Sequence, residues 1–138
     1  MKIVLVPTLY VSDVGEALEF YKKAFGAEER WRITKEDGSV HVAELTLQNI
    51  FIRLHEESAH DRNLTPQSAS GTTVVLGLLT DDPDDMAARA VTTGGTLLSP
   101  VKDYEYGYRQ GTVRDPFGHH WCLEGLRGLT EKPSFDTY

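Results

Sequence analysis

The residues with the clearest potential for chemistry lie on one face of a predicted strand, Ile50 to Glu56. Within this strand Phe51, Arg53 and His55 alternate with isoleucine and leucine, so one face is apolar and the other carries a ring, a guanidinium and an imidazole. A guanidinium on the inner face of a small protein must contact an anion or remain in water. An aromatic ring beside it adds a flat surface on which planar molecules stack. The pair of Phe51 and Arg53 therefore predicts binding of a planar or anionic small molecule.

Two partners for Arg53 stay open at this point. Glu124 lies on the matching strand of the second half of the chain and has the parity of an inward-facing residue, so it is one internal partner. A bound carboxylate or phosphonate is the other. His55 follows on the same face and is either a ligand donor and proton carrier near neutral pH or a surface residue at the strand end.

A second group of reactive side chains alternates along the segment that ends at Glu124. His120, Cys122 and Glu124 share one face of this predicted strand, while Trp121 and Leu123 point toward the core. Two interpretations are open for the three. They are either ordinary strand residues, with the cysteine as a small hydrophobe, or ligands of a divalent metal.

A metal site with rearranged ligands would draw on His41, Glu44, His120 and Glu124, which carry suitable donor atoms. Their spacing disfavours such a site. His41 and Glu44 are three residues apart on a predicted strand and are expected to point to opposite faces.

Three tyrosines lie in the loop and strand that cross the mouth of the predicted site: Tyr104, Tyr106 and Tyr108. Tyrosine supplies rigid contact area together with a hydroxyl, so this group predicts a lid or a dimer surface. Plain packing of a solvated loop is the alternative.

The elements that position these residues occur twice along the chain. In the first half, Asp13 is placed as the N-cap of a helix over 14–25, and Gly26 ends that helix. The same order follows from residue 72, with an offset of 68 residues between Asp13 and Asp81 and between Gly26 and Gly94. Predicted strands span residues 3–11, 28–34, 40–47, 50–56 and 72–79, and another strand begins at 96 after a helix to about 93.

This repeat predicts an α+β fold of two βαβββ modules whose sheets form one curved, concave cup. The expected division is module one at 1–58, a linker at 59–71, module two at 72–126 and a tail at 127–138. The tail is expected to lie along the surface or along a partner subunit.

Length and composition limit the classes of protein. The chain has 138 residues and 15.4 kDa, which suits one domain, and its 14 basic against 21 acidic residues give a net charge of −7. Nucleic-acid binding is disfavoured, because no cluster of basic residues is present to contact phosphates. The single cysteine, Cys122, forms no internal disulfide, and no apolar run is long enough to cross a membrane. A cytoplasmic protein is expected.

A tight turn with the sequence Asp-Pro-Phe-Gly at 115–118, inside the stretch 106–124, joins two predicted strands. Together with the stretch 11–26 and the repeat, it resembles the vicinal oxygen chelate superfamily of glyoxalases, extradiol dioxygenases and bleomycin-resistance proteins. The resemblance extends over residues 3 to 126 and is greatest to the PhnB-like branch. It implies two paired βαβββ modules, a homodimer, and a ligand or a divalent metal in the cup.

In metal-dependent members, four His or Glu ligands lie on the first and fourth strands of each module. Carried over by position, these ligands fall on Pro7, Arg53, Val75 and Cys122 of this chain. The first three do not bind a hard divalent ion, and a guanidinium repels one. The resemblance therefore implies that the usual metal site is absent.

We accordingly expect a metal-free small-molecule binding protein without a cofactor, similar to bleomycin-resistance proteins. Its expected ligand-binding residues are Phe51, Arg53, His55, Tyr108, His120 and Glu124. Two alternatives are a metal-dependent glyoxalase-like lyase or dioxygenase with the rearranged ligands given above, and a subunit scaffold that binds no ligand.

Overall fold

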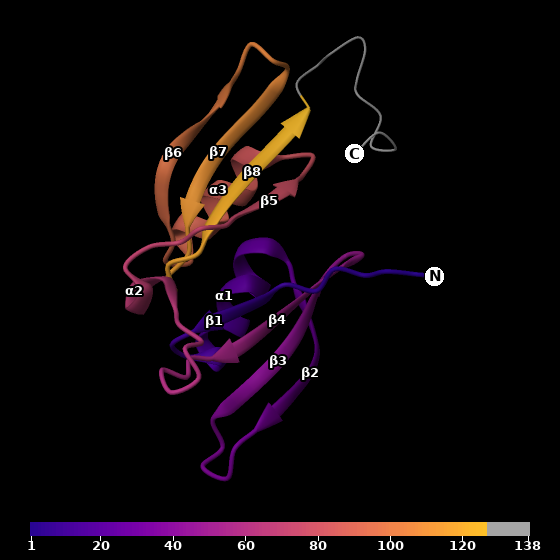
Figure 1. The fold of residues 1–138 in the computed structure, drawn as a ribbon. Helices are drawn as coiled ribbons and strands as arrows, with labels where there is room; N and C mark the ends of the chain where they lie inside the picture. Colours follow the sequence, from indigo (N-terminus) through magenta and orange to yellow (C-terminus); the bar gives the residue numbers. More distant parts are fainter. Residues whose placement is uncertain (127–138) are drawn as a thin grey trace.

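The computed structural model describes residues 1–126, and its strands form two separate four-stranded sheets (Figure 1). Module one has the order β1-β4-β3-β2 and module two the order β5-β8-β7-β6. The α+β fold of two βαβββ modules is confirmed, and the predicted tail at 127–138 lies outside the described residues. The elements are β1 Thr8–Val11, α1 Val14–Phe25, β2 Glu28–Thr34, β3 Val40–Leu47, β4 Ile50–Glu56, α2 Pro66–Ala69, β5 Val75–Leu79, α3 Pro83–Thr92, β6 Thr96–Asp103, β7 Tyr108–Arg114 and β8 His120–Leu126.

Helix α1 begins and ends where the sequence predicts. The side chain of Asp13 accepts a hydrogen bond from the Glu16 N–H at 2.9 Å, which satisfies one of the free N–H groups of the first turn. Gly26 ends the helix with a φ of 71°, a left-handed conformation that glycine adopts without a side-chain clash. The apolar side of α1 packs on module one, where Leu18 and Leu54 are fully buried.

The β3–β4 hairpin is closed by a two-residue turn, Gln48 and Asn49, so the register between the two strands is fixed. Leu47 pairs with Ile50, and each earlier residue of β3 pairs with a later residue of β4. Strand β1 joins the sheet parallel to β4, with Thr8 beside Arg53. Ile52 and Leu54 face α1, as the alternation in the sequence predicts.

Three predictions about the chain outside these elements are wrong. The first strand covers 8–11 rather than 3–11, because the segment before Pro7 extends away from the sheet (Figure 1). Likewise, β5 starts at Val75 rather than at residue 72. The segment predicted to be a linker contains the short helix α2, which the sequence did not indicate. The helix N-caps of the two modules, Asp13 and Asp82, are 69 residues apart rather than 68.

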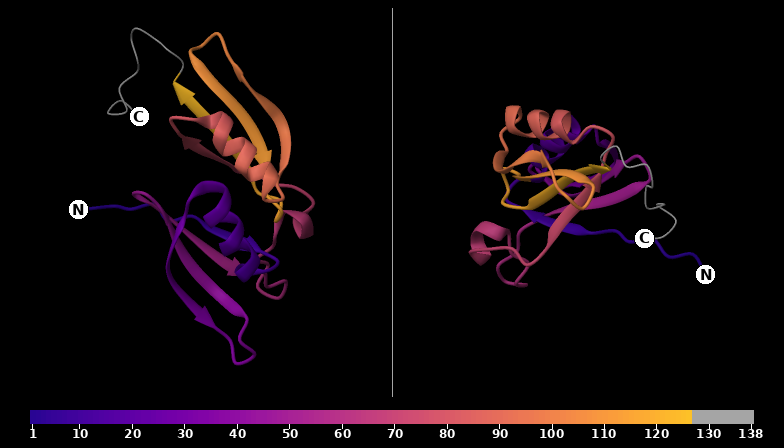
Figure 2. Two further views of the ribbon diagram at one scale, coloured as in Figure 1. Left: turned by 180° about the vertical axis from the view of Figure 1, so that it is seen from behind. Right: turned by 90° about the horizontal axis from the view of Figure 1, so that it is seen from above.

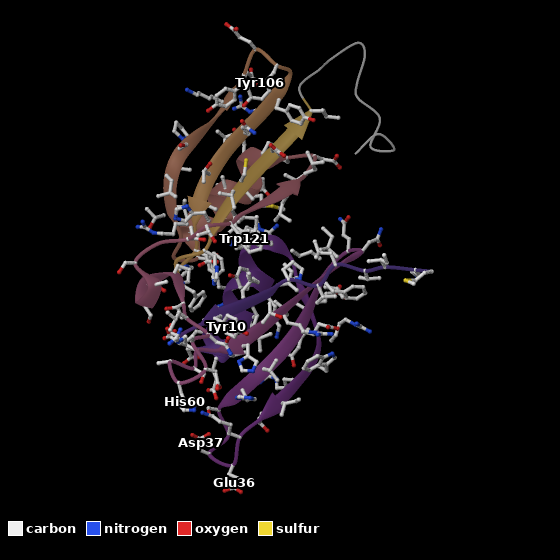
Figure 3. All side chains as sticks on the ribbon, viewed as in Figure 1. Tyr10, Glu36, Asp37, His60, Tyr106 and Trp121 are labelled. Atoms are coloured by element: carbon white, nitrogen blue, oxygen red, sulfur yellow. The ribbon has the colours of Figure 1, made fainter. Side chains whose placement is uncertain are left out.

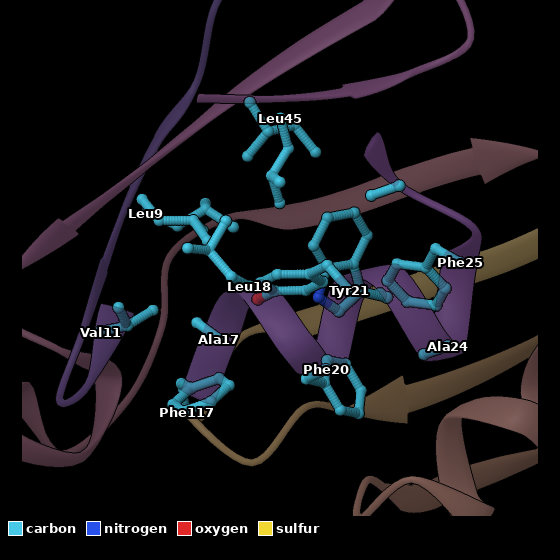
Figure 4. Packing of buried hydrophobic residues seen from close by; sticks show 14 of the residues in the cluster. Leu9, Val11, Ala17, Leu18, Phe20, Tyr21, Ala24, Phe25, Leu45 and Phe117 are labelled. Atoms are coloured by element: carbon cyan, nitrogen blue, oxygen red, sulfur yellow. The ribbon is translucent and has the colours of Figure 1, made fainter. Parts of the chain in front are cut away.

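The two modules are joined through α1, which packs on module one and also on the end of module two (Figure 4). The ring of Trp121 lies 5.6 Å from that of Tyr21 and 4.9 Å from that of Phe25. Phe117, in the β7–β8 turn, packs against Phe20 and Tyr21. Trp121 and Leu123 are buried in one continuous core, as predicted.

A buried carboxylate, Asp115, lies at the centre of this junction. It accepts hydrogen bonds from the Tyr21 hydroxyl, from Trp121 Nε1 at 2.9 Å, and from the N–H groups of Phe117 and His119 at 2.9 and 3.0 Å. Burial, followed by the negative charge of Asp115, raises the pKa of Tyr21 well above its usual value, so the phenol stays a donor. This contact fixes the position of module two relative to α1.

Helices α1 and α3 contact each other and lie on the same side of the two sheets (Figure 2). The opposite side of each sheet, which we call its open face, is covered by neither α1 nor α3 (Figure 2). No helix within residues 1–126 is long and apolar enough to span a membrane. The open faces carry the polar side chains that the sequence singled out.

Candidate ligand-binding site

The open face of module one is organised around a buried carboxylate, Glu44, directly opposite Arg53 on the neighbouring strand. Its side chain is only 4% exposed and accepts hydrogen bonds from Arg53 Nε at 2.9 Å and from an Arg30 terminal nitrogen at 2.6 Å. The indole N–H of Trp31 adds a third bond at 3.2 Å. One carboxylate therefore orients two guanidinium groups.

Glu44 is held in its ionised form. Burial alone would raise its pKa, but the hydrogen bond from Arg53 and the charges of Arg30 and Arg53 outweigh burial and lower the pKa below its usual value. Two cations and one anion leave a net charge of +1 at this cluster. The side chains of Arg30 and Arg53 are 48% and 47% exposed, so that charge is accessible from the open face.

The guanidinium of Arg53 uses only one of its edges in the sheet. Nε bonds to Glu44, whereas the two terminal nitrogens of Arg53 form no hydrogen bond within residues 1–126. Arg30 lies 4.7 Å over the centre of the Phe51 ring, and Phe51 is half-buried. A planar anion placed on Arg53 would thus have a bidentate donor pair beside an aromatic surface.

The internal partner of Arg53 differs from the one considered from the sequence. Arg53 pairs with Glu44, not with Glu124, which belongs to the other sheet. His41 and Glu44 also do not diverge as predicted, because the β2–β3 pairing is irregular next to His41. The His41 ring lies 4.6 Å from His55, which follows Arg53 on β4.

His55 lies at the end of β4 between two other rings. Its ring centre is 5.6 Å from that of Tyr10 and 4.6 Å from that of His41 (Tyr10 is labelled in Figure 3). His55 Nδ1 is 2.7 Å from the Glu56 carbonyl oxygen, which only accepts, so the proton is on Nδ1. In the neutral ring, Nε2 is then a hydrogen-bond acceptor.

Module two carries a separate polar group around Glu124. Gln110 Nε2 donates to Glu124 at 2.6 Å, and the Cys122 sulfur lies 3.6 Å from the same carboxylate. Tyr106 donates its hydroxyl proton to the Gln110 side-chain oxygen (Tyr106 is labelled in Figure 3). Tyr108 packs against Tyr106 with ring centres 5.9 Å apart, so Tyr108 and Glu124 belong to one cluster.

Cys122 is protonated in this surrounding. Burial raises the pKa of its thiol to about 11, with further contributions from the charge of Glu124 and a hydrogen bond to it. Since the thiolate is the nucleophile, Cys122 is inert near neutral pH.

His120 lies apart from this cluster, at the start of β8. It lines a cavity of about 700 Å³ between the 66–75 segment and the β7–β8 turn. The structure thus brings Phe51 and Arg53 together on one module and Tyr108 and Glu124 together on the other. It leaves His55 and His120 at strand ends.

The donor atoms present do not fit a divalent metal. Within residues 1–126, no three His, Cys, Asp or Glu side chains are grouped so that they could hold one. The rearranged set is divided between the modules, with His41 and Glu44 on one and His120 and Glu124 on the other. Both carboxylate oxygens of Glu44 are already bonded to arginines.

Two residues of the candidate site, Arg30 and Gln110, were not identified from the sequence. Arg30 lies at an irregularity of β2 between Glu29 and Trp31, and such a bulge leaves no reliable pattern in a sequence. Gln110 lies opposite Glu124 in the β7–β8 pairing. Predicting this pair from the sequence requires the exact length of the β7–β8 turn, which sets the register of the two strands.

Comparisons with known proteins agree with this architecture. The family model of the glyoxalase/bleomycin resistance protein/dioxygenase superfamily matches residues 3–123. An uncharacterized protein of Mycobacterium bovis is 37% identical over 122 residues, with 86% of this chain and 80% of that protein covered. An uncharacterized protein of Arabidopsis thaliana is 32% identical over 119 residues, with 80% of this chain and 70% of that protein covered.

Solved structures share the fold. TioX from Micromonospora sp. ML1 superposes with a TM-score of 0.70 at 22% identity, covering 93% of this chain and all of TioX (100%). The fosfomycin resistance protein FosX from Mesorhizobium loti superposes with a TM-score of 0.65 at 16% identity, covering 94% and 95% of the two chains. At these identities the likeness concerns the fold alone.

Proposed function

Because the chain belongs to the glyoxalase/bleomycin resistance protein/dioxygenase superfamily, we propose that it is a metal-free binding protein for a small molecule with a planar anionic group. The ligand is held on the open faces, and its anionic group contacts Arg53. Phe51 and Arg30 contact the planar part of the ligand. Tyr108, His120 and Glu124 from module two and His55 from module one complete the proposed lining.

The observation that carries this proposal is the state of Arg53. Glu44 orients the guanidinium through Nε, and the two terminal nitrogens form no hydrogen bond within residues 1–126. Because Arg30 shares the same carboxylate, the cluster retains a positive charge that an anion would neutralise. A carboxylate or a phosphonate matches this donor geometry.

The residues at the superfamily's metal positions support binding without a metal. In the structure, the residues that lie beside Arg53 and Cys122 on the first strand of each module are Thr8 and Gly77, rather than the Pro7 and Val75 that the resemblance gives by position. These four positions offer a threonine hydroxyl, a guanidinium, a glycine without a side chain and a protonated thiol. All of them are poor ligands for a hard divalent ion. This supports the binding protein over the alternative of a lyase or dioxygenase with rearranged ligands.

Other features of the proposal rest on the sequence. They are the PhnB-like branch, a cytoplasmic location, and the division into 1–58, 59–71 and 72–126. The name of FosX, a fosfomycin resistance protein, favours a bioactive compound as the ligand. A homodimer likewise rests on the resemblance to the superfamily.

Replacing Arg53 by Gln is expected to weaken binding of a planar anion about tenfold or more, because a charge-assisted hydrogen bond contributes roughly 1.5–3 kcal/mol. A thermal-shift screen with aromatic carboxylates and aryl phosphonates, in buffer containing EDTA, identifies the compounds that stabilise the wild-type protein. These compounds are then titrated into R53Q.

The matched control is R32Q. Arg32 lies on the same module, pairs with Glu29 at 2.7 Å, and is opposite Ala43 rather than Glu44. R32Q should bind like the wild type. Equal affinity of R53Q and the wild type for every stabilising compound would refute the role of Arg53.

A further inference from the structure

The cavity at the end of module two has walls that the fold holds in place. It has a volume of about 700 Å³ and lies between residues 66–75 and the β7–β8 turn. Helix α2 is anchored to that turn, since Gln67 Nε2 donates a hydrogen bond to the Pro116 carbonyl oxygen at 3.3 Å (Figure 1). Gly118 permits this close approach, because a Cβ atom at its position would lie 2.9 Å from Cβ of Pro66. These contacts keep the two walls of the cavity at a fixed separation.

Three polar side chains form a row along this cavity. Arg114 lies opposite Thr96 on β6 and opposite His120 on β8, and all three residues line the cavity. Their neighbours Val113 and Trp121 are buried in the core, so Arg114 and His120 point to the open face. Residues directly opposite on antiparallel strands have Cβ atoms about 4.5–5.5 Å apart. One small group in the cavity can therefore contact the guanidinium and the imidazole together.

The charge of Arg114 is not neutralised within residues 1–126. The side chains of Arg114 and His120 form no hydrogen bond or ion pair there, whereas every other arginine of this range except Arg62 forms an ion pair. This is unexpected in a chain with 21 acidic against 14 basic residues. The acidic residue that lines the cavity, Asp115, has its carboxylate turned to the core, where it accepts a hydrogen bond from the Tyr21 hydroxyl. Arg114 is exposed, so its charge is accessible to an anion in the cavity.

The rest of the lining favours a polar ligand. It includes the hydroxyl-bearing residues Ser70, Thr72 and Thr73 and the side chain of Gln67. Each of these side chains can both donate and accept hydrogen bonds. Within residues 1–126, no phenylalanine, tyrosine or tryptophan lines the cavity. The cavity therefore suits a hydroxylated molecule rather than the planar one proposed for the surface around Arg53.

We propose that this cavity binds a small hydroxylated molecule through an oxyanion group, a phosphate ester or a carboxylate, that contacts Arg114 and His120. A guanidinium binds either group through two parallel N–H donors, and a neutral imidazole adds one N–H. The inference goes beyond the proposed function, because the cavity lies on the other module from Arg53. His120 is the one residue that the cavity shares with the lining proposed above.

The test uses the full chain and three compounds that share a sugar ring and differ in charge: glucose 6-phosphate, glucuronate and glucose. Each compound is titrated into the protein at constant ionic strength, and the histidine ring protons are followed by NMR. The His120 signal is assigned as the one that is missing in His120→Asn. We expect this signal to shift with glucose 6-phosphate, with glucuronate or with both, and not with glucose. A response to only one charged compound identifies which oxyanion the cavity prefers.

Replacing Arg114 by Gln is expected to weaken binding of the charged sugar about tenfold, because it removes a charge-assisted hydrogen-bonded contact. The affinity is measured by calorimetry. His120→Asn provides a second variant, with an expected loss of about fivefold for one neutral donor. The matched control is R62Q, since Arg62 is also exposed and without an ion pair within residues 1–126 but does not line the cavity. R62Q should bind like the wild type.

The proposal is overturned if neither charged compound shifts the His120 signal, or if R114Q and H120N bind as tightly as the wild type. R53Q should bind the charged sugars like the wild type, because Arg53 does not line this cavity. Failure at the cavity is therefore distinguishable from failure of the planar-anion site around Arg53.

Discussion

Replacing Asp115 by Ala is expected to lower the free energy of unfolding by about 4 kcal/mol, the largest effect of any single change discussed for this chain. The carboxylate is 3% exposed and accepts four hydrogen bonds. Its removal leaves the Tyr21 hydroxyl, the Trp121 indole and two backbone N–H groups without acceptors in the core. Because those donors belong to both modules, the loss acts on the junction as well as on the turn.

Urea unfolding followed by tryptophan fluorescence measures this effect. If D115A does not fold, Tyr21→Phe removes a single donor from the same carboxylate and is expected to cost about 1–2 kcal/mol. Asp37→Ala is the matched control, since Asp37 also accepts bonds within a turn but is exposed. A D115A variant as stable as D37A would contradict the account of the junction.

Replacing Glu44 by Gln is expected to destabilise the protein and to strengthen binding of planar anions. Gln keeps an acceptor oxygen for one arginine but removes the negative charge, so the net charge beside Arg30 and Arg53 rises from +1 to +2. We expect a loss of about 1–2 kcal/mol in the free energy of unfolding and about tenfold tighter binding of aromatic carboxylates.

The pH dependence follows from the lowered pKa of Glu44. A carboxyl whose pKa is lower in the folded state stabilises the fold above its unfolded pKa, and this stabilisation is lost as the pH falls below 4.5 through the folded pKa. Because E44Q has no carboxyl at this position, its free energy of unfolding should fall less than that of the wild type as the pH is lowered. Glu36→Gln, at an exposed turn, should change neither stability nor affinity, and a weaker anion affinity of E44Q would contradict the proposed charge at Arg53.

Local patterns predicted the elements of module one well, because the signals lie within a few residues. Asp13 and Gly26 mark the ends of α1, and period-two alternation marks β4. The same reasoning extended the first strand back to residue 3, because an apolar sequence does not reveal where the segment leaves the sheet. Helix α2 was not predicted either, because a helix of four residues is too short to show a helical period in its sequence.

The partner of Arg53 was within reach of the sequence. With a two-residue turn at Gln48 and Asn49, residue 47 must pair with 50, so Glu44 must lie opposite Arg53. The alternation of inward-facing and outward-facing residues, taken alone, instead indicated Glu124 on the other module as the internal partner of Arg53. The relative placement of the two modules could not be predicted, because it depends on the contact between Asp115 and Tyr21, 94 residues apart in the chain.

The central claim, binding through a guanidinium rather than through a metal, is tested most directly by the metal content of the protein. Untagged protein is incubated with Ni²⁺, Zn²⁺, Mn²⁺ or Fe²⁺, dialysed, and analysed by plasma mass spectrometry. We predict far less than one metal ion per chain, because the residues beside Arg53 and Cys122 are poor ligands. Near-stoichiometric metal that is lost on replacing His120 or Glu124 by Ala would contradict the account and identify the chain as a metal-dependent protein.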